Sequence, residues 1–326
     1  MATLFITGAA GFIASTASEA LLRKGYDIVG IDNFCDYYDV NLKRQNVECV
    51  KKVAEETGRS YKLIEGDIRD KDLINDLFGS YNFVACIHWA AMAGVRPSIE
   101  NPAYYVDVNI NGLMNILEGC RNYCKKLVFI SSSSVYGNNK KVPFSEKDSV
   151  DHPISPYAAT KKAGELLCHT YHSLFNIDIN CLRYFTVYGP RQRPDLAINK
   201  FTRLLLQGKH IPMFGDGTTA RDYTYVDDIV EGTILSLEYL LKHDNVYDVF
   251  NLGGSNPISL KEMIDIVGKT VGVEPVIDKM PMQAGDVNIT YSDYSHAKEV
   301  LNYEPKIRIE EGIRRFVEWY KTNNGF

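Results

Sequence analysis

The sequence predicts an α/β fold, a doubly wound parallel sheet with a smaller mixed α/β lobe. Apolar runs of strand length alternate with longer segments of helical period, as in parallel sheets whose strands are joined by crossover helices. A glycine-containing turn follows the first apolar run and opens the first helical segment. This alternation loosens after about Arg183, so the later part of the chain is expected to form the second lobe.

The strands of the large sheet are expected at Thr3–Thr7, Asp27–Asp32, Tyr61–Glu65, Phe83–His88, Lys126–Ser131 and Asp178–Leu182. The helices are expected at Phe12–Lys24, Asn41–Glu56, Asp70–Phe78, Ala103–Tyr123, Tyr157–Phe175 and Asp227–Leu241. Asp248–Leu252 is predicted to return to the sheet as a further strand. The remainder from Pro257 mixes short elements and ends in an amphipathic helix near Ile309–Lys321.

Prolines and a Gly-Asp-Gly turn interrupt residues 186–225, so two interleaved lobes are expected rather than two consecutive domains. Residues 1–185 with 226–255 would form the sheet domain, and residues 186–225 with 256–326 the smaller lobe. Parallel sheets of this kind bind ligands outside the carboxyl ends of their strands, at a topological switch point. We therefore expect a site between the two lobes.

The composition excludes several functional classes. Charged residues make up 24% and the net charge is −5, so no basic surface indicates nucleic-acid binding. The seven cysteines are scattered and contain no Cys-x-x-Cys pair, which argues against a zinc site and fits a reducing compartment. Neither a leader peptide nor an apolar span of about eighteen residues is apparent. We expect a cytoplasmic protein without nucleic-acid or membrane partners.

The turn after the first strand is predicted to bind a pyrophosphate. Gly8 and Gly11 allow a tight turn and a close backbone approach, and the following helix offers unpaired N–H groups at its N-terminus. Ala14 stands where a third glycine is common and is small enough to replace it. Asp32 ends the second strand, where a carboxylate accepts from a ribose 2′-hydroxyl and repels a 2′-phosphate. NAD is therefore favoured over NADP, the alternative being an aspartate that merely starts a polar turn.

Further residues at the strand ends extend this cofactor site. Asp67 and Ile68 follow the third strand and are expected to flank the adenine. Small residues after the fourth strand leave a path for the cofactor backbone; these are Ala90, Ala91 and Ala93.

The chemical end of the site is predicted at a helix N-terminus. Ser155 is expected as the N-cap and Pro156 in the first turn. Tyr157 and Lys161 are four residues apart, so they lie on one helical face. A neighbouring ammonium lowers the pKa of a phenol, which would make Tyr157 a base near neutral pH. The alternative is a surface tyrosine with a solvated lysine.

A serine-rich turn, residues 131–134, follows the fifth strand at the edge where the site is expected. A hydroxyl donates and accepts hydrogen bonds, so Ser132 could hold a substrate oxygen against the tyrosine. Ordinary loop chemistry is the alternative. Taken together with the glycine turn, Asp32 and the Tyr157–Lys161 pair, however, the set favours an active site.

Further motifs occur along essentially the whole chain. They are His88-x-Ala90-Ala91, Asn109, Arg183-Tyr184-Phe185, the run Arg221–Asp228, and Asn251-Leu252-Gly253. With this set the chain resembles the extended short-chain dehydrogenase/reductase family, most closely its nucleotide-sugar 4-epimerases. Residues 184–195 resemble the subgroup that acts on UDP-glucuronate. The chain departs from the family pattern at Ala14, Met92 and Asn288, and the last two lie in substrate-side loops, so the resemblance specifies the fold more closely than the substrate.

The resemblance implies a Rossmann-type NAD-binding domain and a smaller nucleotide-sugar-binding lobe. It implies that Tyr157 takes the proton of the sugar 4-hydroxyl, Ser132 orients the 4-oxygen, and Lys161 lowers the pKa of Tyr157 and holds the nicotinamide ribose. NAD would be regenerated in each turnover and stay bound. The implied cofactor-binding residues are Gly8, Gly11, Phe12, Ile13, Asp32, Asn33, Asp67, Ile68, Ala90, Ala91, Ala93, Asn109, Tyr157, Lys161 and Tyr184.

The substrate end is expected to bind a UDP-sugar. Arg221 is suited to a diphosphate, and Phe214 to a uracil pocket; both could instead be packing residues. Arg191 and Arg193, in a proline-bounded loop, suit a uronate carboxylate, the alternative being two solvated loop charges. The remaining expected substrate contacts are Ser132, Ser133, Ser134, Thr186 and Asp286.

Oxidation of a uronic acid at carbon 4 gives a β-keto acid that loses carbon dioxide readily. The resembling decarboxylases and 4,6-dehydratases carry acidic residues where this chain has Ser133 and Ser134. Their absence favours epimerisation of UDP-glucuronate; a neutral UDP-hexose such as UDP-glucose or UDP-N-acetylglucosamine is the main alternative, and a catalytically silent NAD sensor the third. The resemblance also implies a homodimer packed through helices near Ala103–Tyr123 and Tyr157–Phe175, whose apolar stripes could equally be intrachain core.

Overall fold

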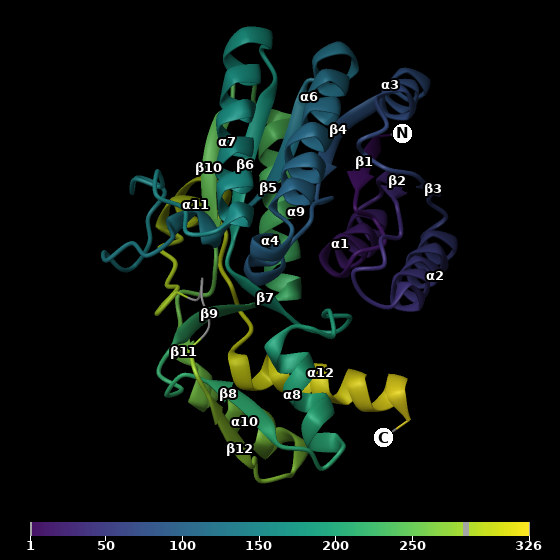
Figure 1. Ribbon diagram of the computed structural model, residues 1–326. Coiled ribbons are helices and arrows are strands. Elements are labelled where there is room, and N and C mark those ends of the chain that lie inside the picture. Colours follow the sequence, from purple (N-terminus) through teal and green to yellow (C-terminus); the bar gives the residue numbers. More distant parts are fainter. Residues whose placement is uncertain (1, 283–286, 326) are drawn as a thin grey trace.

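The computed structural model describes residues 2–282 and 287–325 and is built around a seven-stranded parallel sheet (Figure 1). The strand order is β10-β6-β5-β4-β1-β2-β3. The strands are β1 Thr3–Thr7, β2 Asp27–Asp32, β3 Tyr61–Glu65, β4 Phe83–His88, β5 Lys126–Ser132, β6 Asp178–Tyr184 and β10 Tyr247–Leu252. Each predicted strand is present, which confirms the predicted fold class.

Helices cover both faces of this sheet, because alternate residues of each strand point to opposite sides. In β1, Leu4 and Ile6 pack in the apolar cluster that includes α1 and α9, whereas Phe5 packs in the cluster of α3, α6 and α7. The long helices are α1 Phe12–Arg23, α2 Val40–Thr57, α3 Lys71–Ser80, α6 Gly112–Tyr123, α7 Pro156–Phe175 and α9 Val226–Lys242. In the described part of the chain, no helix is both long and apolar enough to cross a bilayer.

The helix predicted over Ala103–Tyr123 is confirmed as a continuous helical stretch, and it contains a π-helical turn that the sequence did not predict. The chain forms the short helices α4 Val95–Glu100 and α5 Pro102–Val106, then a π-helical turn over Asp107–Asn111, and only then α6. Asn101 caps α5, accepting a hydrogen bond from Tyr104 N at 3.3 Å. The Asn109 side chain is buried in this π-helical turn. Hydrophobic periodicity in the sequence does not predict such a turn.

The smaller lobe lies beyond the carboxyl ends of the sheet (Figure 1). Its described residues contain a three-stranded sheet, a two-stranded parallel sheet and three helices. These elements are β7 Thr186–Tyr188, β8 Ile211–Phe214, β9 Ala220–Tyr225, β11 Pro257–Ser259, β12 Ile277–Met280, α8 Ala197–Leu206, α10 Leu260–Val271 and α12 Ile309–Asn324. The helix α11 Ser295–Leu301 lies instead beside β10 and α9 of the large sheet domain (Figure 1).

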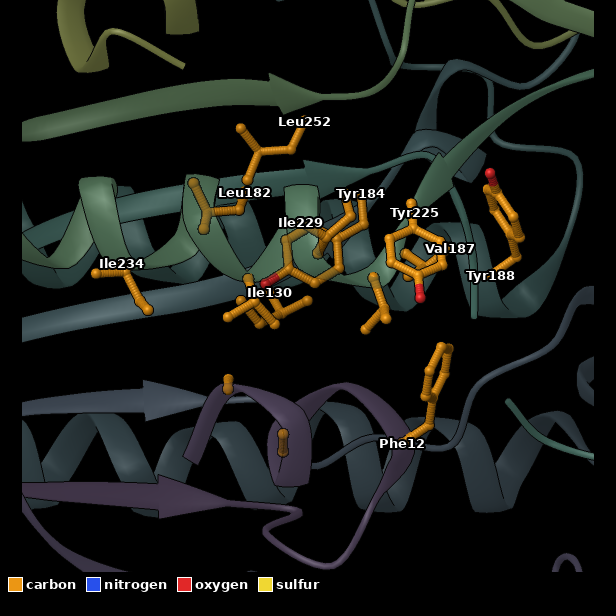
Figure 2. Packing of buried hydrophobic residues seen from close by; sticks show 14 of the residues in the cluster. Phe12, Ile130, Leu182, Tyr184, Val187, Tyr188, Tyr225, Ile229, Ile234 and Leu252 are labelled. Atoms are coloured by element: carbon orange, nitrogen blue, oxygen red, sulfur yellow. The ribbon is translucent and has the colours of Figure 1, made fainter. Parts of the chain in front are cut away.

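One apolar cluster runs from the large sheet into the smaller lobe. Figure 2 shows its centre, where Ile130 and Tyr184 lie beside Ile229 of α9, with Phe12 of α1 across from them. The same cluster includes Phe201 of α8 and Phe316 of α12. Because the two lobes share this apolar core, side-chain packing between them fixes the walls of the cavity that lies between the lobes.

A buried ion pair fastens α7 to the sheet. Glu165 accepts from Arg183 Nε and Nη2, both at 2.8 Å, and from Ser131 Oγ at 2.6 Å. The side chains of Glu165 and Arg183 are only 2% and 3% exposed. Arg183 Nη1 also donates to Tyr136 Oη at 2.9 Å, and Tyr136 donates to Asn251 Oδ1 at 2.7 Å. The network therefore joins α7, β5, β6 and β10.

Glu165→Gln is expected to lower the free energy of unfolding by about 3–5 kcal/mol, because the buried Arg183 charge would lose its counter-ion. Urea unfolding followed by circular dichroism measures this change. Arg314→Gln, which removes the surface ion pairs of Arg314 with Glu311 and Glu318, serves as the control and should leave the unfolding midpoint almost unchanged. Equal losses in the two variants would contradict the importance of the buried pair.

Candidate active site

A cavity of about 520 Å³ opens at the carboxyl ends of the strands, where the strand order switches between β1 and β4. It collects side chains from both lobes. Of the residues predicted from the sequence, those lining it are Gly8, Gly11, Phe12, Ile13, Asp32, Asn33, Asp67, Ile68, Ala90, Ala91, Ala93, Ser132, Ser133, Ser134, Tyr157, Lys161, Tyr184, Thr186, Arg193 and Arg221.

The glycine turn forms one wall by close backbone approach. Gly8 has φ +68°, and a Cβ there would lie 2.9 Å from the backbone nitrogen of Ala90. Gly11 is the N-cap of α1 and supplies no side-chain cap, so the first-turn N–H groups of the helix are left for an anionic ligand. Thr7 Oγ1 lies 2.8 Å from His88 Nδ1 and accepts from Ala90 N at 3.0 Å, which ties together the ends of β1 and β4.

Asp32 lies buried at the end of β2, beside this turn. Its carboxylate accepts from Ala10 N at 3.1 Å, Phe34 N at 2.8 Å and Lys43 Nζ at 3.3 Å. An ionised carboxylate offers about four acceptor positions, so one remains for a ligand hydroxyl. Lys43 is a lining residue that sequence reasoning missed. Its place in an amphipathic helix looked like that of a solvated lysine, and only the fold buries it against Asp32.

Asp67 and Asn33 are hydrogen-bonded to each other at the same end of the cavity. Asn33 Nδ2 donates to Asp67 Oδ2 at 2.9 Å, and Arg69 donates to both carboxylate oxygens of Asp67. These hydrogen bonds with Arg69 are the main reason that the pKa of Asp67 falls to about 2. Asp67 is therefore ionised at neutral pH.

Tyr157 and Lys161 line the opposite end, on the first turns of α7. Ser155 caps this helix as predicted, accepting from Ala158 N at 3.1 Å. Lys161 Nζ donates to the backbone oxygen of Ile130 at 2.8 Å, and burial lowers the pKa of Lys161 to about 8. The helical spacing thus places both side chains at the end of β5.

The pKa of Tyr157 differs from the sequence expectation. Burial raises it, while hydrogen bonding to Ser132 and the positive charge of Arg193 act in the lowering direction. Lys161 Nζ donates to the Ile130 carbonyl and keeps its positive charge, so the effect of Lys161 on the pKa of Tyr157 stays a prediction. The groups that favour a phenolate here come from other elements.

The serine turn presents its hydroxyls beside Tyr157. Ser132 accepts from Ser134 N at 3.2 Å and from Ser134 Oγ at 3.0 Å, which fixes the turn. Since Ser134 donates its hydroxyl hydrogen to Ser132, Ser132 retains its own hydrogen for another partner.

Arg193 brings a positive charge to the same end from the smaller lobe. Its Nε and Nη2 donate to Asp195 at 3.0 and 2.8 Å, and its guanidinium lies 5.1 Å from the ring centroid of Tyr37. Sequence reasoning missed Tyr37 and Tyr38, which line the cavity from the segment after β2. Two adjacent tyrosines in a polar turn were the only signal for them.

Three of the predicted residues that the structure describes do not line the cavity. Asn109 is buried behind the cavity, where its side chain accepts from Met92 N at 2.8 Å and donates to Thr160 Oγ1 at 3.0 Å. Arg191, which was predicted to lie in the site with Arg193, does not line the cavity. Its Nη2 donates to Glu19 of α1 at 2.7 Å. Phe214 is not a lining residue either; Arg96 lies 5.4 Å from its ring centroid. Asp286 lies outside the described residues.

Comparisons with known proteins agree with this geometry. The family model described as GDP-mannose 4,6 dehydratase matches residues 5–316. The chain is 45% identical to a UDP-glucuronate 4-epimerase of Thermodesulfobacterium geofontis, an alignment that covers 99% of this chain and 97% of the relative. It is 43% identical to UDP-glucuronate 4-epimerase 4 of Arabidopsis thaliana, over 98% of this chain and 75% of the relative.

A solved structure shares the whole architecture. The crystal structure of the UDP-glucuronic acid 4-epimerase from Bacillus cereus in complex with UDP-glucuronic acid and NAD superimposes with a TM-score of 0.90 at 36% identity. The match covers 98% of this chain and 99% of that one. The protein thus belongs to the nucleotide-sugar epimerases of the extended short-chain dehydrogenase/reductase family.

Proposed function

We propose that this protein is an NAD-dependent epimerase that inverts carbon 4 of UDP-glucuronate to give UDP-galacturonate. The observation that carries the proposal is the meeting of Tyr157, Ser132 and Arg193 at one end of a cavity whose other end suits a dinucleotide. The similarity to UDP-glucuronate 4-epimerases supports the choice of sugar.

The residues present fit NAD. A side chain at Gly8 would fill the space beside Ala90, where a pyrophosphate needs close backbone approach, and the uncapped start of α1 faces this turn. Asp32 keeps one acceptor position for a ribose hydroxyl, and its charge disfavours a 2′-phosphate. Bound NAD would supply an acceptor, and after reduction a donor, of hydride at carbon 4.

The two lobes divide the ligands between them in this proposal. Residues 1–185 with 226–255 would bind NAD, and residues 186–225 with 256–326 would bind the UDP-sugar. Arg221 lines the cavity from β9 and suits the diphosphate, while Thr186 of β7 lies on the sugar side. Asn109 would act indirectly, since it braces the segment around Met92 against α7.

Proton transfer is assigned to Tyr157. As a phenolate it would take the proton of the 4-hydroxyl and return it to the 4-oxygen after the keto sugar has turned over in the site. Ser132 would donate to the same oxygen and hold it against Tyr157, with Ser133 and Ser134 forming the adjacent wall. Lys161 is oriented by the Ile130 carbonyl and would use its other N–H groups on the nicotinamide ribose.

Arg193 provides a carboxylate receptor at the sugar end. The acidic residues among the described lining side chains are Asp32 and Asp67, both on the cofactor side, and Asp195 is paired with Arg193. A β-keto acid intermediate would therefore be held by a cation, and no described lining residue at that end is a carboxylic acid that could protonate an enolate. This arrangement supports epimerisation over decarboxylation or dehydration.

We also propose a homodimer in the cytoplasm. Apolar side chains on adjacent helices support a packing surface: Leu166 and Leu174 of α7 are 57% and 65% exposed, and Tyr123 of α6 is 47% exposed. The free cysteine thiols are consistent with a reducing compartment.

Tyr157→Phe should lower kcat by about 10²–10⁴-fold, because it removes the proton acceptor and leaves the ring in place. The measurement is conversion of UDP-glucuronate with added NAD, followed by NMR. The dissociation constant for UDP should stay within about twofold of the parent protein. Full turnover by Tyr157→Phe would show that Tyr157 is not the proton acceptor, whereas absence of turnover in the parent protein would favour an NAD-sensing role.

Ser132→Ala should shift the rising limb of the pH profile of kcat to more alkaline pH. Ser132 acts to lower the pKa of Tyr157, so its removal leaves the effect of burial less opposed, and a higher pH is needed to form the phenolate. A pH series on both proteins tests this shift. An unchanged or acid-shifted limb would show that Ser132 does not stabilise the base.

Arg193→Ala should lower kcat/KM for UDP-glucuronate by about 10–150-fold, the range for a lost hydrogen bond between charged groups. Arg191→Ala is the matched control, because Arg191 pairs with Glu19 outside the cavity. Turnover of UDP-glucose, if present, should hardly change in either variant. A parent protein that converts UDP-glucose or UDP-N-acetylglucosamine but not UDP-glucuronate would replace the proposed substrate with a neutral hexose.

A further inference from the structure

Arg193 reaches the cavity from a loop between β7 and α8, so its guanidinium needs an external restraint. A long side chain loses rotamer entropy when it is held in one geometry. The pair with Asp195 joins two residues of the same loop and moves with that loop. It therefore sets the shape of the loop without fixing where the charge lies relative to the reacting atoms.

Tyr37 supplies a restraint from the opposite side. It belongs to the segment after β2, in the large sheet domain, and its ring lies over the Arg193 guanidinium at 5.1 Å. The interaction is also electrostatic: burial raises the pKa of Tyr37, and the positive charge of Arg193 acts in the lowering direction. This contact connects the smaller lobe to the sheet domain at the sugar end of the cavity.

Tyr37 is itself held by neighbours of the catalytic base. It hydrogen-bonds with Tyr105 of α5, which donates to the backbone oxygen of Ala93 at 3.0 Å. The edge of the Tyr105 ring meets Tyr157, with centroids 6.3 Å apart and planes at 81°. Arg193 is thus linked to Tyr157 through two aromatic rings.

We propose that Tyr37 is a positioning residue that holds Arg193 in register with Tyr157 and thereby sets the preference for a sugar bearing a carboxylate at carbon 5. This inference rests on the proposed function and adds a residue to it. Asp195 takes Nε and Nη2, and the guanidinium lies over the face of the Tyr37 ring. The edge formed by Nη1 is then the part of Arg193 that can donate to a substrate carboxylate in its own plane.

The test replaces the ring over Arg193. Tyr37→Leu should raise KM for UDP-glucuronate by about 2- to 30-fold, the range expected for loss of a partly buried cation–π contact. The change in kcat should stay under about threefold, since Tyr157 and Ser132 are intact. The dissociation constants for UDP and NADH, measured by calorimetry, should be unchanged. Tyr37→Phe is the matched control and should keep most of the affinity, because its ring still covers Arg193.

A double-mutant cycle separates positioning from a general structural role. In an Arg193→Ala background, Tyr37→Leu should cause no further rise in KM for UDP-glucuronate. Independent, multiplicative effects of the two substitutions would overturn the inference, as would an unchanged KM in Tyr37→Leu alone. Should the leucine variant not fold, Tyr37→Gln at this half-exposed loop position provides the same comparison.

The parent protein distinguishes failure of the inference from failure of the proposed function. No turnover of UDP-glucuronate by the parent protein would overturn the proposed function, and the inference with it. Normal turnover by the parent together with an unchanged KM in Tyr37→Leu and Tyr37→Gln would overturn only the role of Tyr37.

Discussion

Three residues spaced four apart on α7 connect the fold of this protein to its chemistry. Tyr157, Lys161 and Glu165 share one helical face. Glu165 fastens the helix to β6 through the buried Arg183, and Lys161 fastens it to the end of β5 through the Ile130 carbonyl. Tyr157, one turn closer to the N-terminus, is thereby presented to the cavity. A buried ion pair contributes uncertain net stability, but here it determines where the base lies.

Burial disfavours the phenolate form of Tyr157, and neighbouring groups of the site favour it. Burial raises the pKa of Tyr157, as it does for any phenol removed from water. Burial also lowers the pKa of Lys161 to about 8, so this side chain remains mostly protonated at neutral pH. Ser132 from β5 and Arg193 from the smaller lobe act against the effect of burial on Tyr157, so groups from both lobes favour the phenolate.

Charged side chains of both signs line the cavity. The carboxylates of Asp32 and Asp67 lie at the end where the glycine turn meets β2 and β3, with Lys43 paired to Asp32, and the cations Lys161, Arg193 and Arg221 line the rest. Acceptors suit ribose hydroxyls, whereas guanidinium groups suit a diphosphate or a carboxylate. A dinucleotide and an anionic nucleotide sugar can therefore occupy the cavity side by side without placing like charges together.

The sequence by itself determined the parallel sheet, its seven strands and most of the cavity lining. Strand-length apolar runs, the turn at Gly8 and Gly11, and the spacing of Tyr157 and Lys161 are local patterns, and topology brings strand ends to one edge. Local patterns do not report partners distant in the chain. The tertiary structure alone turned Arg191 toward Glu19 and Arg193 into the cavity, although the two are two residues apart. It also placed a π-helical turn at Asn109, buried Lys43 against Asp32, and set the Arg193 guanidinium over the Tyr37 ring. In each case the deciding contact joins residues from different elements, and its strength depends on a burial that exists only in the folded chain.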